Sequence, residues 1–293
     1  MATLRDIKQR IKGVKNTQQI TKAMKMVAAA KLRRAQDAII NARPYAKKIQ
    51  SLISDLTSDD DINSNPLFIQ RQVKNVAIVV ITADRGLCGA FNTNIIREAN
   101  RFIDEEILKE NLSYSLFCVG KKGKDFFTKR NFNVVDSFVG IFSSLDFSFA
   151  QRLSDRLITG YINGEFDKVI VIFNEFKSII QQKVVVEQYL PILVDKNTNR
   201  NTKASLNYIY EPDRKSIFDF LIPKNLRAQL WRFLLESNAA EFAARMTAMD
   251  NATTNAKELI RTLNLKYNKE RQASITKEIL EIVSGANALK SSQ

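Results

Sequence analysis

The sequence predicts an α/β protein in which a long antiparallel coiled coil of the N- and C-terminal helices accompanies a central Rossmann-like α/β domain. At both ends, apolar residues recur at alternating steps of three and four; between them, apolar strands alternate with helical stretches. Seven of the nine glycines lie between residues 86 and 164, where turns are needed. The predicted segments are an N-terminal helix at 1–57, a linker at 58–72, the α/β domain at 73–211 and a C-terminal helix at 212–293.

The N-terminal segment carries one heptad frame for more than fifty residues, starting at Leu4. The seam is apolar except at Gln18, Thr21 and Lys25. Spacing sustained over this length is typical of a coiled coil, and at ~1.5 Å per residue the helix would be ~80 Å long. Pro44 should kink or loosen it locally, because proline has no backbone N–H to donate.

The C-terminal segment repeats the pattern at 249–263 and again at 275–289. Pro212 and Pro223 are expected to mark its start, so that a helix over 224–289 would measure ~100 Å. Both helices are joined at their inner ends to the same middle domain. We therefore expect them to pair antiparallel and to leave a C-terminal overhang.

The middle of the chain predicts a layered sheet. Residues 76–82 read VAIVVIT, a β-branched and uncharged run that is typical of a strand buried on both faces. Further strands are expected at 115–119, 134–135, 169–173, 183–187 and 208–210, and helices near 94–108, 122–130 and 147–163. This alternation favours a Rossmann-like arrangement.

Composition excludes several classes of function. The chain has no histidine and only two cysteines, which are not in CxxC spacing, so His–Asp catalysis, His- or thiolate-ligated metal sites and a disulfide framework are excluded. We expect no metal and no cofactor. Apolar runs fall far short of the ~20 residues of a membrane span, and the first residues lack a signal-peptide core, so we expect a cytosolic chain.

Two glycine-containing motifs invite a nucleotide-binding interpretation. GKKGK at 120–124 has its glycines three residues apart and is followed by Asp125, whereas a phosphate loop needs GxxxxGK and then Ser or Thr. DRGLCG at 84–89 follows the first strand but lacks GxGxxG spacing, and Cys88 has no evident base to activate it. We interpret both as structural turns and expect neither direct nucleotide binding nor a catalytic residue.

The net charge of +14 is concentrated at the N-terminus, where residues 1–50 hold 13 basic and 2 acidic side chains. Such a stretch is a fair electrostatic footprint for nucleic acid, so a basic coiled-coil nucleic-acid-binding protein is the alternative hypothesis. Against it, Tyr45 is the one aromatic residue among those fifty, which leaves no stacking platform. The polar seam positions admit two interpretations equally: control of helix register, or contact with a third body.

Three motifs in order resemble those of the γ subunits of F-type ATP synthases, of the bacterial type. They are NTQQITKAMKMVAAAK at 16–31, DRGLCGAFN at 84–92, and ITKE at 275–278 with Glu281 and Gly285–Ala286. The resemblance extends over essentially the whole chain. It implies a non-catalytic central rotor shaft that couples proton flow through the membrane sector to ATP synthesis and hydrolysis by rotation.

The same resemblance implies partners and contact positions. The partners would be the α and β subunits as an α3β3 hexamer, the ε subunit and the c-ring, and the location would be the cytoplasmic face of the bacterial inner membrane, held through the complex. We expect exposed, individually weak contacts with the stator at the matching positions, which are Met24, Lys25, Arg245, Arg271, Gln272, Thr276 and Glu278.

Overall fold

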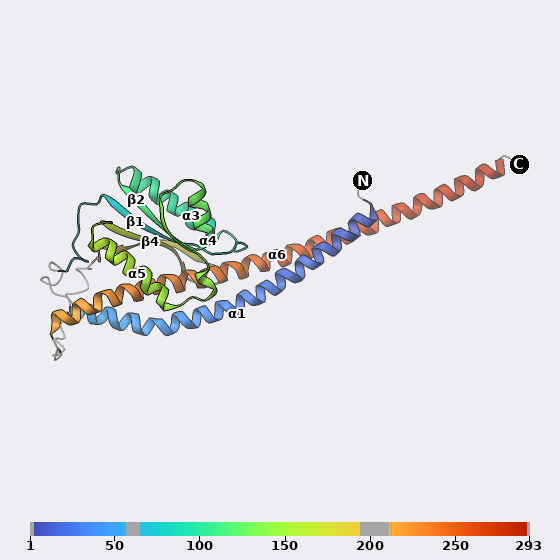
Figure 1. Cartoon of the computed structure of the whole chain (residues 1–293). Coiled ribbons are helices and arrows are strands. Elements are labelled where there is room, and N and C mark those ends of the chain that lie inside the picture. The colour runs from blue at the N-terminus through green and yellow to red at the C-terminus, as the bar shows by residue number, and fades with distance from the viewer. Residues whose placement is uncertain (1–2, 57–64, 194–210, 212, 292–293) are drawn as a thin grey trace. The chain divides into compact units, whose positions relative to one another are not determined.

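The computed structural model describes residues 3–56, 65–193, 211 and 213–291. The chain forms two units, each described by itself: a coiled-coil unit of Met1–Val27 with Met246–Gln293, and a sheet unit of Ala28–Arg245. Two helices contribute to both units, α1 (Leu4–Leu56) and α6 (Arg214–Ser291) (Figure 1). The segment boundaries at 57, 72 and 211 remain predictions.

The described residues of the sheet unit form five strands in the order β3-β2-β1-β4-β5. Their bounds are β1 (Asn75–Ile81), β2 (Ser113–Val119), β3 (Val134–Phe138), β4 (Lys168–Phe176) and β5 (Gln182–Leu190). The first four run parallel, and β5 is antiparallel to β4. The parallel layer confirms the predicted Rossmann-like arrangement and adds one antiparallel edge. The strand predicted at 208–210 lies outside the described residues.

Three helices accompany the strands between α1 and α6. They are α3 (Phe91–Phe102), which continues as a π-helix (Ile103–Leu108), α4 (Lys121–Lys129) and α5 (Phe147–Ile162). The Asp146 carboxylate accepts a hydrogen bond from the backbone N–H of Ser148, which caps the start of α5. A short 3₁₀ turn (Ile141–Ser143) separates β3 from α5.

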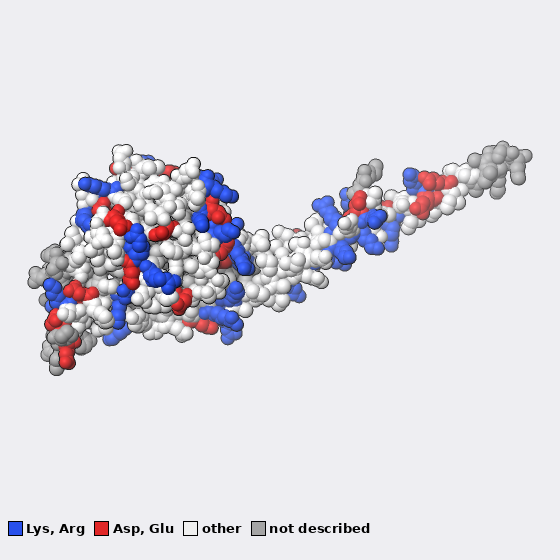
Figure 2. Space-filling view, in the orientation of Figure 1, with Lys and Arg blue, Asp and Glu red and all other residues white. Residues whose placement is uncertain are grey.

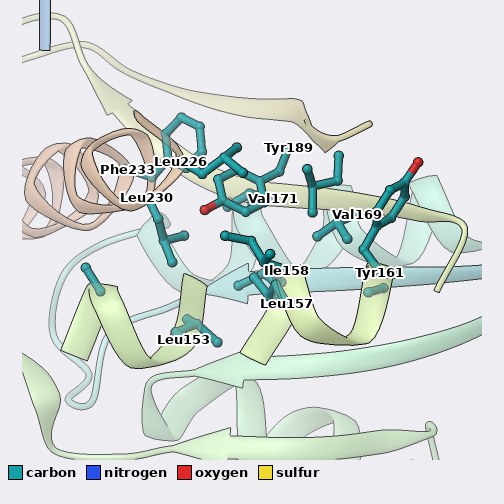
Figure 3. Packing of buried hydrophobic residues seen from close by; sticks show 14 of the residues in the cluster. Leu153, Leu157, Ile158, Tyr161, Val169, Val171, Tyr189, Leu226, Leu230 and Phe233 are labelled. Carbon is teal, nitrogen blue, oxygen red and sulfur yellow. The ribbon is translucent and has the colours of Figure 1, made fainter. Parts of the chain in front are cut away.

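Both faces of the sheet are buried, which explains the uncharged β1 run. Val79 and Ile81 point to the face covered by α5 and the first part of α6, and Ile78 and Val80 point to the face covered by α3 and α4. Figure 3 shows the first of these layers, where side chains of α5, β4, β5 and α6 pack together.

The helix α6 begins at Arg214 and runs through Pro223, so it starts earlier than the 224–289 span from which its length was estimated. Proline in a helix interior costs ~3 kcal/mol or more. The flanking residues Phe218, Ile222 and Leu226 are each at most 1% exposed and pack in the sheet core, so burial of this turn outweighs the proline penalty.

The helix α1 keeps its predicted seam and contains Pro44 without interruption of its helical span. Every seventh residue is buried or half-buried, at Ile7, Val14, Thr21, Ala28, Ala35, Ala42 and Ile49.

In the coiled-coil unit α1 and α6 pair antiparallel, as predicted. Thr21 meets Thr253 (2.8 Å between the hydroxyl oxygens), and four residues later along α1 Lys25 meets Asp250, three residues earlier along α6 (2.6 Å). Continuing this register, Thr3, the first described residue and the one just before α1, lies opposite residue 271 or 272. Beyond it, the side chains of α6 that the structure describes are exposed except for the half-buried Ser274, which confirms the predicted overhang.

Candidate functional site

The carboxylate of Asp84 connects three loops at the carboxyl edge of the parallel sheet. It follows β1 and accepts hydrogen bonds from the backbone N–H of Lys121 (3.0 Å) and of Gly140 (2.9 Å). Lys121 is the first residue of α4. In a phosphate loop, the N-terminus of the helix binds the phosphate group. In this chain, the N-terminus of α4 instead binds the Asp84 carboxylate.

The glycines of the GKKGK motif are explained by a close approach to β1. Gly120 has φ of +100°, and a Cβ there would lie 2.0 Å from the backbone oxygen of Thr82. Gly123 donates its N–H to the Thr82 hydroxyl (2.8 Å), and a Cβ on Gly123 would lie 2.9 Å from that oxygen. The geometry supports the structural-turn interpretation of this motif.

Cys88 lies buried beneath the 84–89 turn. Its sulfur accepts a hydrogen bond from the Asn92 amide (3.2 Å), and burial raises the pKa of the thiol. Burial also raises the pKa of Cys118, to about 12. Both thiols are thus held in the protonated, weakly nucleophilic form, which contradicts the nucleophile interpretation of Cys88.

A buried ion pair attaches the same turn to α6. The Arg245 guanidinium donates one hydrogen bond to the backbone oxygen of Gly86 and another to the Glu241 carboxylate (2.6 Å). The Arg245 and Glu241 side chains are 11% and 8% exposed. Burial raises the pKa of Glu241, and the bond from Arg245 opposes that rise. The expected exposure of Arg245 is therefore wrong; we call Gly86, Glu241 and Arg245 the junction.

In the coiled-coil unit, two of the three polar seam positions of α1, Thr21 and Lys25, contact polar side chains of α6. The hydroxyls of Thr21 and Thr253 lie within hydrogen-bond distance of each other. Each hydroxyl also lies within hydrogen-bond distance of a backbone carbonyl of its own helix, so its single proton can go to either acceptor. Lys25 pairs with Asp250 while its side chain stays 40% exposed. These contacts favour register control for Thr21 and Lys25, and the half-buried Gln18 has no contact across the seam among the interactions described here.

The remaining predicted contact positions are distributed over the coiled-coil unit. Met24 is half-buried on α1. The predicted polar positions on the last part of α6 are all exposed: Arg271 and Gln272 at the start of the overhang, and Thr276 and Glu278 on it. They alternate with exposed apolar side chains at Ile275, Ile279 and Ile282. Figure 2 shows groups of Lys and Arg side chains on the visible face of this unit.

A cavity of about 780 Å³ in the sheet unit has the size of a small-molecule site. Its lining includes Tyr45 of α1, Trp231 of α6 and the ion pair between Arg232 and Glu187 (3.0 Å). Among its lining residues Arg232 is the one cation, and Glu187 neutralises it. The cavity therefore lacks a free positive charge for a phosphate.

Comparisons with known proteins identify the family. The family model described as ATP synthase matches residues 3–289. A curated ATP synthase gamma chain of Chloroherpeton thalassium is 52% identical over 303 aligned residues that cover 100% of both chains. The chain belongs to the ATP synthase gamma chain family. The gamma chain of Chlorobium limicola is 54% identical, with 99% of this chain and 100% of that one covered.

Solved structures agree with the family assignment. The central stalk and c-ring structure of Tetrahymena thermophila mitochondrial ATP synthase contains a chain 26% identical, with a TM-score of 0.62, covering 80% of this chain and 99% of that one. A chain of the Euglena gracilis mitochondrial enzyme shares the fold at a TM-score of 0.70 and 22% identity, over 98% and 94% of the two chains.

As a gamma chain, this protein serves as the rotor shaft of an ATP synthase. The alternative hypothesis of a nucleic-acid-binding protein gains no support from these comparisons. Of the helices that the structure describes, none is long and apolar enough to cross a membrane. A gamma chain is part of a membrane-associated complex through its neighbours.

Sequence reasoning missed three residues that shape these sites. The sequence did not indicate that Asp84 binds the loops after β2 and β3. It also did not indicate that Glu241 pairs with Arg245 or that Thr253 contacts Thr21. An acidic residue four positions before an arginine was a signal for the Glu241–Arg245 pair, because residues at i and i+4 share a helix face. The contacts of Asp84 and Thr253 span tens to hundreds of residues, so local patterns do not reveal them.

Proposed function

We propose that this gamma chain is a non-catalytic shaft that turns with proton flow and presents different faces to the α and β subunits in succession. Each β subunit would then pass through binding, synthesis and release, because the shaft favours one β conformation over the others at each angle. The ε subunit and the c-ring would bind the chain, and the complex would hold it at the cytoplasmic face of a bacterial inner membrane.

The observation that carries this proposal is the overhang of α6. Among the residues that the structure describes, no helix lies opposite this part of α6, yet it carries exposed isoleucines at 275, 279 and 282. Exposed apolar side chains at helical spacing are typical of a surface that another protein covers. Hydrogen bonds from the neighbouring polar residues Gln272 and Glu278 would determine how the partner protein is oriented on this surface.

The sheet unit supports the non-catalytic part of the proposal. Asp84 occupies the start of α4, and Arg232 in the cavity is paired with Glu187. Purified chain should therefore show no Mg-ATPase activity, whereas the same chain assembled with α and β subunits should. Hydrolysis by the purified chain that disappears in a Lys124→Ala variant would refute both the assignment and the structural-turn interpretation.

The contact positions are tested in the assembled complex in inverted membrane vesicles. Gln272→Ala should lower ATP synthesis and ATP-driven proton pumping while the complex stays assembled, because one exposed contact is worth on the order of 1 kcal/mol. Met24→Lys should couple less efficiently, since a charge replaces a flexible apolar side chain. Asn264→Ala, which changes an exposed amide outside the predicted set, is the matched control. Pumping by both variants at the level of this control would show that the contact positions are wrong.

A further inference from the structure

The junction is an internal contact that holds α6 against the 84–89 turn, and its buried side chains are not available to a partner protein. Arg245 and Glu241 are one turn apart on α6, so the carboxylate holds the guanidinium in place from the same helix. The other hydrogen bond reaches the backbone oxygen of Gly86, 159 residues away in sequence. An arginine fork presents donors in fixed directions, so the two bonds together define the orientation of α6 against the turn.

Two further charged groups lie near the pair and act on Glu241 in opposite directions. Lys31 of α1 and Asp84 of the turn are the further charged groups that act on Glu241, and Lys31 lies 5.4 Å from the ring centre of Phe242 on the next position of α6. The four charges of Lys31, Asp84, Glu241 and Arg245 balance to zero. Because the central pair is about nine-tenths buried, water screens it little, and removing either partner leaves the other unpaired.

Rotation of α6 about its own axis is the motion that this bond resists best. A side chain on the surface of a helix lies roughly 5–6 Å from the helix axis. Turning the helix by about 10° therefore displaces the attachment point by about 1 Å, enough to break a hydrogen bond whose normal range is only about 0.5 Å wide.

We infer that Arg245 is a positioning residue for rotary coupling, which acts inside the chain by locking the rotation of α6 against the carboxyl end of β1 through the Gly86 carbonyl. Arg245 is the last α6 residue of the sheet unit, and α6 continues without interruption beyond it. A turn of the sheet unit is thereby imposed on the helix at this point. The inference rests on the proposed shaft function and replaces the expected stator contact of this one residue.

The test uses the assembled complex in inverted vesicles, with proton pumping divided by ATP hydrolysis as the readout. Arg245→Lys keeps the positive charge but loses the fork, and it should lower this ratio several-fold while assembly and Trp231 fluorescence stay those of the parent. Arg97→Ala, an exposed arginine of the same unit that contacts only Asn94 among the interactions described, is the matched control and should keep the ratio.

A crosslinking experiment distinguishes an internal positioning role of Arg245 from a direct contact between Arg245 and the stator. In a Leu87→Cys/Arg245→Cys variant, a bismaleimide of about the length of an arginine side chain should join the turn to α6 and restore the ratio, whereas N-ethylmaleimide should not. The native thiols at 88 and 118 are buried and stay unmodified. An unchanged ratio in Arg245→Lys, or no restoration by the crosslink, overturns the inference. Absence of pumping by the parent complex would instead refute the proposed function.

Discussion

Truncation of Phe233 should unfold the sheet unit at much lower denaturant concentration. Phe233 of α6 is 0% exposed, stacks on Phe173 of β4 at 4.5 Å between ring centres and contacts Tyr189 of β5 edge-on at 6.5 Å. A buried Phe→Ala change costs about 3–5 kcal/mol, because the lost transfer free energy is joined by the cost of the cavity. With a urea m-value of about 3 kcal/mol/M, the midpoint should fall by about 1–2 M.

The chain carries its own probe for this measurement. Trp231 is its one tryptophan, two residues before Phe233, and its ring lies edge-on to Phe147 of α5 at 5.9 Å. Tryptophan fluorescence in a urea titration therefore reports the separation of α6 from α5. Phe220→Ala is the matched control on the same helix, since Phe220 is 62% exposed and its main contact is Lys224, 4.0 Å from the ring centre. It should cost below about 1 kcal/mol.

The result that would refute the reasoning is equal behaviour of the two variants. If Phe233→Ala and Phe220→Ala shift the fluorescence midpoint by the same small amount, α6 does not contribute its buried face to the sheet core. In that case the explanation given for the passage of α6 through Pro223 also fails, because it depends on the same burial.

Three further outcomes are expected. Gly120→Ala should abolish folding of the sheet unit or destabilise it severely, as measured by circular dichroism and urea titration, because its Cβ would collide with the Thr82 carbonyl at 2.0 Å. Thr21→Val should cost about 1 kcal/mol while Thr21→Val/Thr253→Val costs less than twice that amount, because the two hydroxyls share one hydrogen bond; additive costs in thermal unfolding would contradict the pairing. Burial raises the pKa of Glu241, so the folded state binds the proton of this carboxyl more tightly than the unfolded state does. The contribution of Glu241 to the free energy of unfolding should therefore fall as the pH rises from the ordinary glutamate pKa of 4.5 through the raised pKa of the folded state. Unfolding measured against pH should show this decrease as a difference between the parent and Glu241→Gln.

Periodic patterns predicted the fold because they report burial directly. The seam of α1, from Ile7 to Ile49, is buried where the heptad frame places it, and β1 is buried on both faces as its uncharged sequence indicates. The burial of each seam and strand depends on residues that are neighbours along one helix or one strand. The antiparallel pairing and the overhang were predicted differently, from the attachment of both helices to the same middle domain and from the greater length of the C-terminal one.

Features that depend on distant partners were not predictable in this way. Pro223 was expected to mark the start of the C-terminal helix, and the stabilising burial of Phe218 and Ile222 in the sheet core, which lets the helix begin before this proline, is invisible to local propensity. Arg245 was expected to be exposed as one of the weak contacts with the stator, yet its side chain is mostly buried and its partner Gly86 lies far away in sequence. The antiparallel direction of β5 also needed the structure, since a short apolar strand carries no sign of its direction.

The seven-residue spacing of the buried α1 positions has a mechanical consequence. A straight α-helix drifts ~20° per heptad from such a repeat, so over the six intervals from Ile7 to Ile49 the seam stays with a partner helix only if the pair supercoils left-handed. A left-handed supercoil is not symmetric under twist: one sense of torque winds the helices tighter and the other opens them. The middle of the seam is alanine, at 28, 35 and 42. Torsional stiffness of the pair should therefore differ between the two directions of rotation, with the stiffer response in the sense that tightens the coil.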